Sequence, residues 1–221
     1  MIERTERSNA TQGVMTKLAE HLGALGFDPK PADQSFYRTS ATGRWAFHVA
    51  FIPHQRDFDL TADVAVRIDA IEDLVNQYDT KLSKVERRRS MTLGVELGNL
   101  TLGRQMRWTI ANPSDIPTIC EQVAAMFERV GLPFLQNHSD LATVHRVLAS
   151  ASPKDTLLSP ILGPRSMRTL ASAYLLDQSI DIKAIADNLE AKLIDNEDLY
   201  LEDFRALGRW LLGKQSSSRL E

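Results

Sequence analysis

The sequence contains a single cysteine, Cys120, among its 221 residues. One cysteine excludes an intrachain disulfide and a cysteine cluster for zinc or iron–sulfur binding, and it fits a reducing compartment. No apolar run approaches the roughly 20 residues that a membrane helix needs, and residues 1–9 are polar and charged, without the apolar core of a signal peptide. We therefore predict a soluble, cytoplasmic protein with no membrane partner.

An excess of positive charge is also missing, because 26 lysines and arginines face 29 acidic residues, for a formal net charge of −3. Without an overall positive field we expect no nucleic-acid partner. The one concentrated basic run, Arg87-Arg88-Arg89, falls where we expect a helix to end, and cations there interact favourably with the helix dipole. We interpret this run as structural.

The sequence further lacks a Walker loop, a nucleotide-binding glycine fingerprint, a nucleophile elbow and a paired-histidine zinc motif. These absences remove the enzyme classes that are most easily read from sequence, although they do not remove all enzymes. We expect no cofactor and no resident metal.

The residues that are present have an ordinary globular composition, with 43% apolar and 25% charged side chains. A chain of this length can form one large domain or one domain with a smaller helical appendage. A first helix is predicted from Thr11, because apolar residues recur there with helical spacing and Gly26 follows as a left-handed C-terminal residue. The apolar positions are Val14, Met15, Leu18, Leu22 and Leu25.

The next segment alternates with the period of a β-strand. One alternating run ends at Pro53, and a second follows the polar segment 54–57, so the two predict a hairpin. The first apolar row is Trp45, Phe47, Val49 and Phe51, and the second is Phe58, Leu60, Ala62, Val64, Val66 and Ile68. Further strands are predicted at residues 36–39, 91–97 and 104–110, which gives an antiparallel sheet of four or five strands.

Helices are predicted on either side of the last two strands. Asp69 and Glu72 have capping-box spacing, and the helix that they begin should run to the arginine run. A helix from Ser114 should carry Cys120 on its apolar face, as a small core residue rather than a nucleophile, and end at residues 131–133. Both helices and the first one should cover the apolar side of the sheet.

The fold class predicted is therefore α+β, followed by a helical C-terminal segment. We expect an α+β domain at residues 1–149, a proline-containing connecting loop at 150–164, a helical subdomain packed on the first domain at 165–214, and a tail at 215–221. Helices are expected near residues 140–149, 165–176, 181–194 and 199–212. Trp45 and Trp108 should be core residues, and Trp210 should join the inner stripe of the last helix with Phe204, Leu207 and Leu211.

The best candidate constellation lies on the polar side of the hairpin. If the connecting loop is 52–57, His48 lies opposite Thr61, and if it is 54–57, His48 lies opposite Asp63. Either register predicts that His48, Asp59 and Asp63 cluster. Carboxylates beside a histidine favour its protonated form and can orient it as a base or a metal ligand.

Arg44, Arg67 and Arg107 are candidate binding residues on the same face, where they could neutralise the carboxylates or receive an anion. The alternative is a purely structural role, because one face of an antiparallel sheet is often solvated and carries ordinary surface ion pairs.

Several short motifs follow one another along the chain: Phe36-Tyr37-Arg38, the hairpin, Gly94-Val95-Glu96-Leu97-Gly98, Arg107-Trp108 and Gly131-Leu132-Pro133-Phe134. In this order they resemble a bacterial family of α+β domains of unknown function, over roughly residues 11–149. The resemblance implies a fold and no catalytic residues.

Two functions follow as expectations. The first is noncatalytic binding of a protein partner by an adaptor or inhibitor-like protein that presents the polar sheet face. The second is a hydrolase or metal-assisted enzyme that uses His48 with Asp59 and Asp63, with Arg67 as an anion contact.

Overall fold

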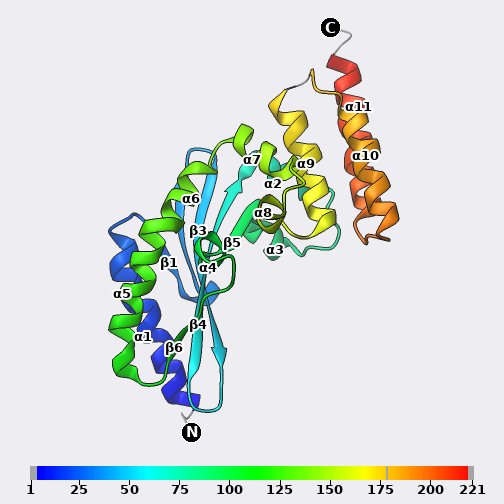
Figure 1. Cartoon of the computed structure of the whole chain (residues 1–221). Helices are drawn as coiled ribbons and strands as arrows, with labels where there is room; N and C mark the ends of the chain where they lie inside the picture. Colours follow the sequence, from blue (N-terminus) through cyan, green and yellow to red (C-terminus); the bar gives the residue numbers. More distant parts are fainter. Residues whose placement is uncertain (1–3, 178, 219–221) are drawn as a thin grey trace. The chain divides into compact units, whose positions relative to one another are not determined.

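The computed structural model describes residues 4–177 and 179–218, and the chain forms two compact units (Figure 1). Unit 1 comprises the described residues up to Val66 together with Gly94–Asn137. Unit 2 comprises Arg67–Leu93 together with the described residues from His138 onward. Each unit is therefore built from two separate stretches of the chain.

The predicted α+β class is confirmed, with an antiparallel sheet and a helical C-terminal segment. The strands are β1 (Asp28–Lys30), β2 (Ser35–Ser40), β3 (Gly43–Pro53), β4 (Phe58–Ile68), β5 (Leu93–Glu96) and β6 (Trp108–Ile110). They follow the order β1-β2-β3-β4-β5, and β6 also pairs with β4. The two long strands β3 and β4 form the predicted hairpin.

The apolar face of this sheet holds the core of unit 1. Phe47, Ala62 and Val64 are fully or almost fully buried, as the alternation predicted. The ring of Phe127 packs edge-on against Phe47, at 5.0 Å between centroids, and against Phe27, at 5.3 Å. Helices α1 (Arg4–Gly23) and α5 (Ile116–Met126) lie side by side over this face (Figure 1).

The local signals at these two helices are confirmed. Gly26 has φ +79°, the left-handed conformation predicted after the first helix. Cys120 is fully buried on α5, and burial raises the pKa of its thiol to about 11, so it is a core residue. Trp108 is also a core residue, at 4% exposed.

The predicted end of the α5 region at residues 131–133 is wrong. The chain continues through a short π-helical stretch, Phe127–Gly131, into α6 (Leu132–Asn137). The Leu132 amide donates to the carbonyl of Phe127, and Pro133 lies in the first turn of α6, where an amide donor is not needed. Gly131 serves close packing, because an added Cβ would lie 2.8 Å from Phe127 and 3.0 Å from Val64.

Unit 2 is helical. Its helices are α2 (Asp69–Val75), α3 (Lys84–Arg89), α7 (Leu141–Ala149), α8 (Pro153–Leu157), α9 (Leu162–Leu176), α10 (Ile182–Asp195) and α11 (Leu201–Ser218), and unit 1 adds the short α4 (Leu97–Thr101). Helix α9 is central, since it packs against α2, α7, α10 and α11. Asp140 and Asp181 cap α7 and α10 by accepting backbone amides.

The single helix predicted from Asp69 to the arginine run is two helices, α2 and α3. Its predicted capping box is absent from α2: Asp69 pairs with Arg67, and Glu72 is buried. The capping box of this region is formed instead by Ser83 and Glu86 at the start of α3. Helix α2 packs on α9 within unit 2, whereas we predicted that the helix from Asp69 would cover the apolar side of the sheet.

The compact units also divide the chain differently from the predicted domains. Residues 67–93 and 138–149 group with the C-terminal helices, and the predicted connecting loop contains α8 and belongs to unit 2. The guanidinium of Arg165 on α9 binds the carbonyls of Val147, Ser150, Asp155 and Ser159 and so joins the segment 147–159 to unit 2. Residues 219–221 of the predicted tail lie outside the described residues, whereas α11 continues to Ser218.

The aromatic predictions for the other two tryptophans are not met. Trp45 is half-buried beneath the guanidinium of Arg38, at 5.1 Å from the ring centroid. Trp210 is 37% exposed, although Phe204, Leu207 and Leu211 form the predicted inner stripe of α11. No helix in the described part of the chain is long and apolar enough to cross a membrane.

Candidate functional site

The hairpin loop decides between the two predicted registers. The backbone amide of His54 donates to the carbonyl of Asp57 at 3.0 Å and closes a tight turn between β3 and β4. Antiparallel pairing continued from this bond places His48 opposite Asp63. Their side chains lie 3.5 Å apart, from Nδ1 to Oδ2, and each is 41% exposed.

Asp59 is the centre of a second cluster on the same face. The Thr109 hydroxyl donates to Oδ1 at 2.7 Å, and His54 Nε2 and Arg107 Nη1 lie 3.0 Å and 3.5 Å from Oδ2. The pairing of Asp59 with Thr109 between β4 and β6 builds this contact into the sheet. The Asp59 side chain is only 13% exposed, and its hydrogen-bond partners keep its carboxylate in one position.

The partners of Asp59 also fix its protonation state. Hydrogen bonds from Thr109 and then from His54 hold the pKa of the Asp59 carboxyl below its usual range, although burial acts in the opposite direction. Asp59 is therefore a carboxylate at neutral pH.

His48, Asp59 and Asp63 do not form one cluster. Asp59 and Asp63 are four residues apart on β4, which corresponds to about 13 Å along a strand. The structure instead pairs His48 with Asp63 and His54 with Asp59. His54 is not among the residues predicted to form the site. In the tight turn at 54–57 its side chain returns to the face that carries Asp59.

The three predicted binding arginines serve three different environments. Arg107 is 46% exposed beside Asp59. The guanidinium of Arg44 stacks over the ring of Tyr37, at 4.8 Å from the centroid. Arg67 belongs to unit 2, where it is 8% exposed and binds Asp69 at 2.7 Å and Asp73 at 2.6 Å. Its guanidinium is occupied by these structural contacts, so the proposed anion site with Arg67 is not assembled.

Within residues 4–177 and 179–218, no group of three or more histidine, cysteine, aspartate or glutamate side chains is placed to hold a metal ion. The two histidines of the hairpin lie beside carboxylates, His48 beside Asp63 and His54 beside Asp59, in the geometry of ion pairs.

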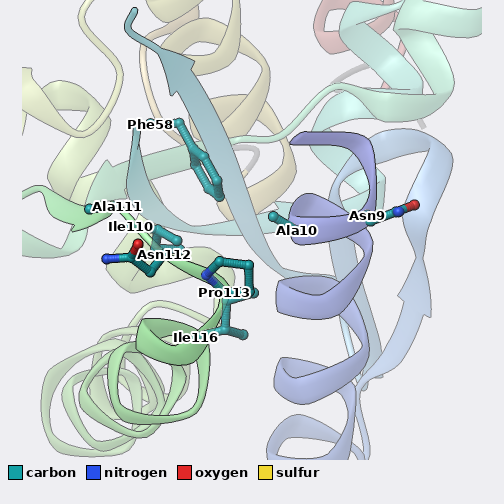
Figure 2. Close-up of a pocket in the computed structure, with 8 residues that line it drawn as sticks. All are labelled: Asn9, Ala10, Phe58, Ile110, Ala111, Asn112, Pro113 and Ile116. Carbon is teal, nitrogen blue, oxygen red and sulfur yellow. The ribbon is translucent and has the colours of Figure 1, made fainter. Parts of the chain in front are cut away.

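A recess lies between the sheet, α1 and the segment that leads into α5 (Figure 2). Because side chains alternate along a strand, Phe58 and Ile110 face this recess while their neighbours Asp59 and Thr109 face away from it. The recess has a volume of about 410 Å³ and is closed by Ala10 of α1 and by residues at the start of α5. Among the described residues that line it, no side chain is titratable, and most of the contact that they offer is apolar.

Comparisons with protein-family models, with curated proteins and with solved structures find no match to this chain. The resemblance to a bacterial family of unknown function therefore stays a prediction.

Asp59→Asn should reduce the stability of unit 1 by about 1–2 kcal/mol at pH 7, because hydrogen bonds to a charged acceptor are lost or weakened. The folded-state pKa of Asp59 is depressed, so its stabilisation is full above the unfolded value of about 3.9 and disappears as the pH falls through the folded value. Urea midpoints measured from pH 7 to pH 3 should therefore converge for the two proteins.

The matched control is Asp63→Asn on the same strand. Asp63 is half-exposed and meets only the half-exposed His48, so its change should alter stability by less than about 0.5 kcal/mol. A constant gap between Asp59→Asn and the unmodified protein across this pH range would contradict the role given to Asp59.

Proposed function

We propose that this protein is a noncatalytic, adaptor or inhibitor-like binding protein that presents the polar face of its hairpin to a protein partner. We call this surface the hairpin face and define it by His48, His54, Asp59, Asp63 and Arg107. The observation that carries the proposal is that these groups form two separate clusters, His48 with Asp63 and His54 and Arg107 with Asp59. In both clusters the histidine, and in the second also Arg107, is more than 40% exposed.

An enzyme site needs its acid, base and nucleophile within hydrogen-bond reach of one reacting centre. On the hairpin face the two carboxylates are about 13 Å apart along β4, and each is already paired with a histidine. Such an arrangement supports recognition more than catalysis.

The exposed fractions of the side chains around Asp59 fit an interface that is built around the fixed charge of this carboxylate. Asp59 is held by three donors, while His54 and Arg107 remain 44% and 46% exposed and can contact a partner. Charges arranged in this way set the orientation and the association rate of a complex more than its affinity. The partner should place an acidic side chain near Arg107 and a basic one near Asp63.

The experiment is photo-cross-linking in the native host, with a photoreactive amino acid at position 48 of the hairpin face. Position 121, which is exposed on α5, is the control. We expect a discrete adduct from position 48 and not from position 121, and we expect the adduct to disappear when Asp63→Lys is added.

Adducts of equal yield from both positions, or an adduct that survives Asp63→Lys, would overturn the proposal. The enzyme alternative makes a different prediction. An esterase or phosphatase activity of the purified protein that is lost in His48→Gln and retained in His138→Gln would replace binding by hydrolysis.

A further inference from the structure

A cavity of about 550 Å³ lies within unit 2, between α7, α9 and α10. This volume falls in the range of small-molecule sites. Most of its wall is apolar, with Leu148 from α7, Leu162 from α9, and Ile185 and Leu189 from α10. None of the described residues that line it is an aspartate or a glutamate.

Arg165 supplies a buried positive charge to this wall. The residue is 8% exposed, and its two terminal nitrogens donate to the carbonyls of Val147, Ser150, Asp155 and Ser159. Its acceptors are neutral, and in the described part of the chain the guanidinium forms no ion pair with a carboxylate. Burial lowers the pKa of Arg165, and the more distant charge of Asp155 acts against it. An arginine nevertheless stays protonated in proteins.

Lys192 adds a second cation at the edge of the cavity. It lies on the face of α10 that also carries Asn188 and Leu189, and its side chain is exposed. Lys183, on another face of the same helix, is neutralised by Asp187 at 2.6 Å. Within the described residues Lys192 has no such acidic partner.

His145 contributes a neutral ring. The hydroxyl of Ser172 donates its only proton to the carbonyl of Thr169 at 3.0 Å. The 3.0 Å contact between His145 Nδ1 and Ser172 Oγ is therefore assigned as a bond donated by Nδ1–H. Burial lowers the pKa of His145, so the ring is uncharged at neutral pH, and the positive charge of the cavity comes from Arg165 and Lys192.

We propose that this cavity binds a small organic monocarboxylate with an apolar body. The carboxylate lies between Lys192 and the guanidinium of Arg165, and the apolar body covers Leu148, Ile185 and Leu189. Four donor contacts of Arg165 are already taken by carbonyls, so its guanidinium offers no two-pronged contact to any anion and acts through its charge. We choose a monocarboxylate over a phosphate because a single negative charge is less costly to place against a mostly apolar wall. The two cations supply the counter-charge that a carboxylate needs in a mostly apolar site.

The test is calorimetric titration of the full chain with three probes: octanoate, octan-1-ol and acetate. Octanoate should bind, while octanol, which lacks the charge, and acetate, which lacks the apolar body, should bind at least tenfold more weakly. Amide and methyl NMR shifts should place octanoate at Leu148, Ile185 and Leu189. Equal affinities for octanoate and octanol, shifts elsewhere in the chain, or no binding of octanoate would overturn the proposal.

Variants of α10 test the charge without touching the buried arginine. Lys192→Met should weaken octanoate binding at least threefold, and Lys192→Glu at least tenfold, with the melting temperature unchanged. Lys183→Met removes a lysine from the same helix and should leave octanoate affinity as it is. An affinity that is unchanged in Lys192→Glu, or that falls equally in Lys183→Met, would refute the assigned carboxylate position.

Discussion

Val64→Asp should unfold unit 1 under conditions in which the unmodified protein remains folded. Val64 is fully buried in β4, on the face that carries Phe47 and Ala62. Its Cγ1 also lies 3.0 Å from the position that a Cβ on Gly131 would occupy, so there is no space for water around a new carboxylate. An unpaired charge at such a position should reduce the free energy of unfolding by about 4 kcal/mol or more.

The control for Val64→Asp is Asp63→Ala, one residue earlier on the same strand. Asp63 points to the opposite face and is half-exposed, so its removal should change stability by less than about 0.5 kcal/mol. Urea unfolding followed by tryptophan fluorescence in a Trp210→Phe background, which leaves Trp45 and Trp108 of unit 1 as the emitters, measures both effects. Similar midpoints for Val64→Asp and the unmodified protein would refute the assignment of faces on which the hairpin face depends.

These two neighbouring residues also show what the sequence could predict. The period of two along β4 identified its buried and polar sides, and the structure has both, because alternation is a property of the strand itself. The turn at residues 54–57 follows one of the two registers left open by the sequence. Secondary structure and faces are thus encoded locally in this segment.

The candidate site could be predicted only in part, because its contacts depend on distance along the strand and on β6. His48 and Asp63 meet, as one register implied. Asp59 lies too far along β4 to join them, and its strongest partner, Thr109, comes from a strand 50 residues later. No sequence pattern connects Thr109 with Asp59, since a lone threonine in a short strand has no distinctive signature.

Unit 2 shows the same limit more clearly. Asp69 and Glu72 have the spacing of a capping box, yet Glu72 is used by Arg168, which lies 96 residues later. The hydrogen bonds from the Arg165 guanidinium to backbone carbonyls likewise join segments that no local motif connects, and so does the cavity beside them. At Glu72 a tertiary ion pair has therefore overridden the local preference for a capping box.

Arg168→Met should destabilise unit 2 by about 3–5 kcal/mol at pH 7, because it leaves a buried carboxylate without its partner. Glu72 is fully buried in α2 and binds Arg168 of α9 through two contacts, at 2.7 Å to Nε and 3.3 Å to Nη2. Burial on its own would raise the pKa of Glu72. The charge and hydrogen bonds of Arg168, with smaller help from Ser90 and Arg67, outweigh burial and lower it.

The pH dependence of Arg168→Met follows from this balance. In the unmodified protein the depressed pKa of Glu72 means that its stabilisation is present above the unfolded value and is lost as the pH falls through the folded one. In the variant, burial without Arg168 favours the neutral acid, so acid should reduce the penalty. The difference in stability between the two proteins should therefore narrow from pH 7 to pH 4.

A double variant and an exposed arginine provide the controls. Glu72→Gln combined with Arg168→Met removes the buried charge and should recover most of the loss, as replacements of buried pairs by neutral groups often do. Arg205 meets Glu190 and Glu202 on the surface of α10 and α11, with about a third of its side chain exposed, so Arg205→Met should reduce stability by less than about 1 kcal/mol.

Unfolding of unit 2 can be followed through Trp210, whose ring packs against Tyr174 of α9 at 6.1 Å between centroids. If Arg168→Met were no more harmful than Arg205→Met, or if the double variant were as unstable as the single one, the Glu72–Arg168 contact would not stabilise the packing of α2 on α9.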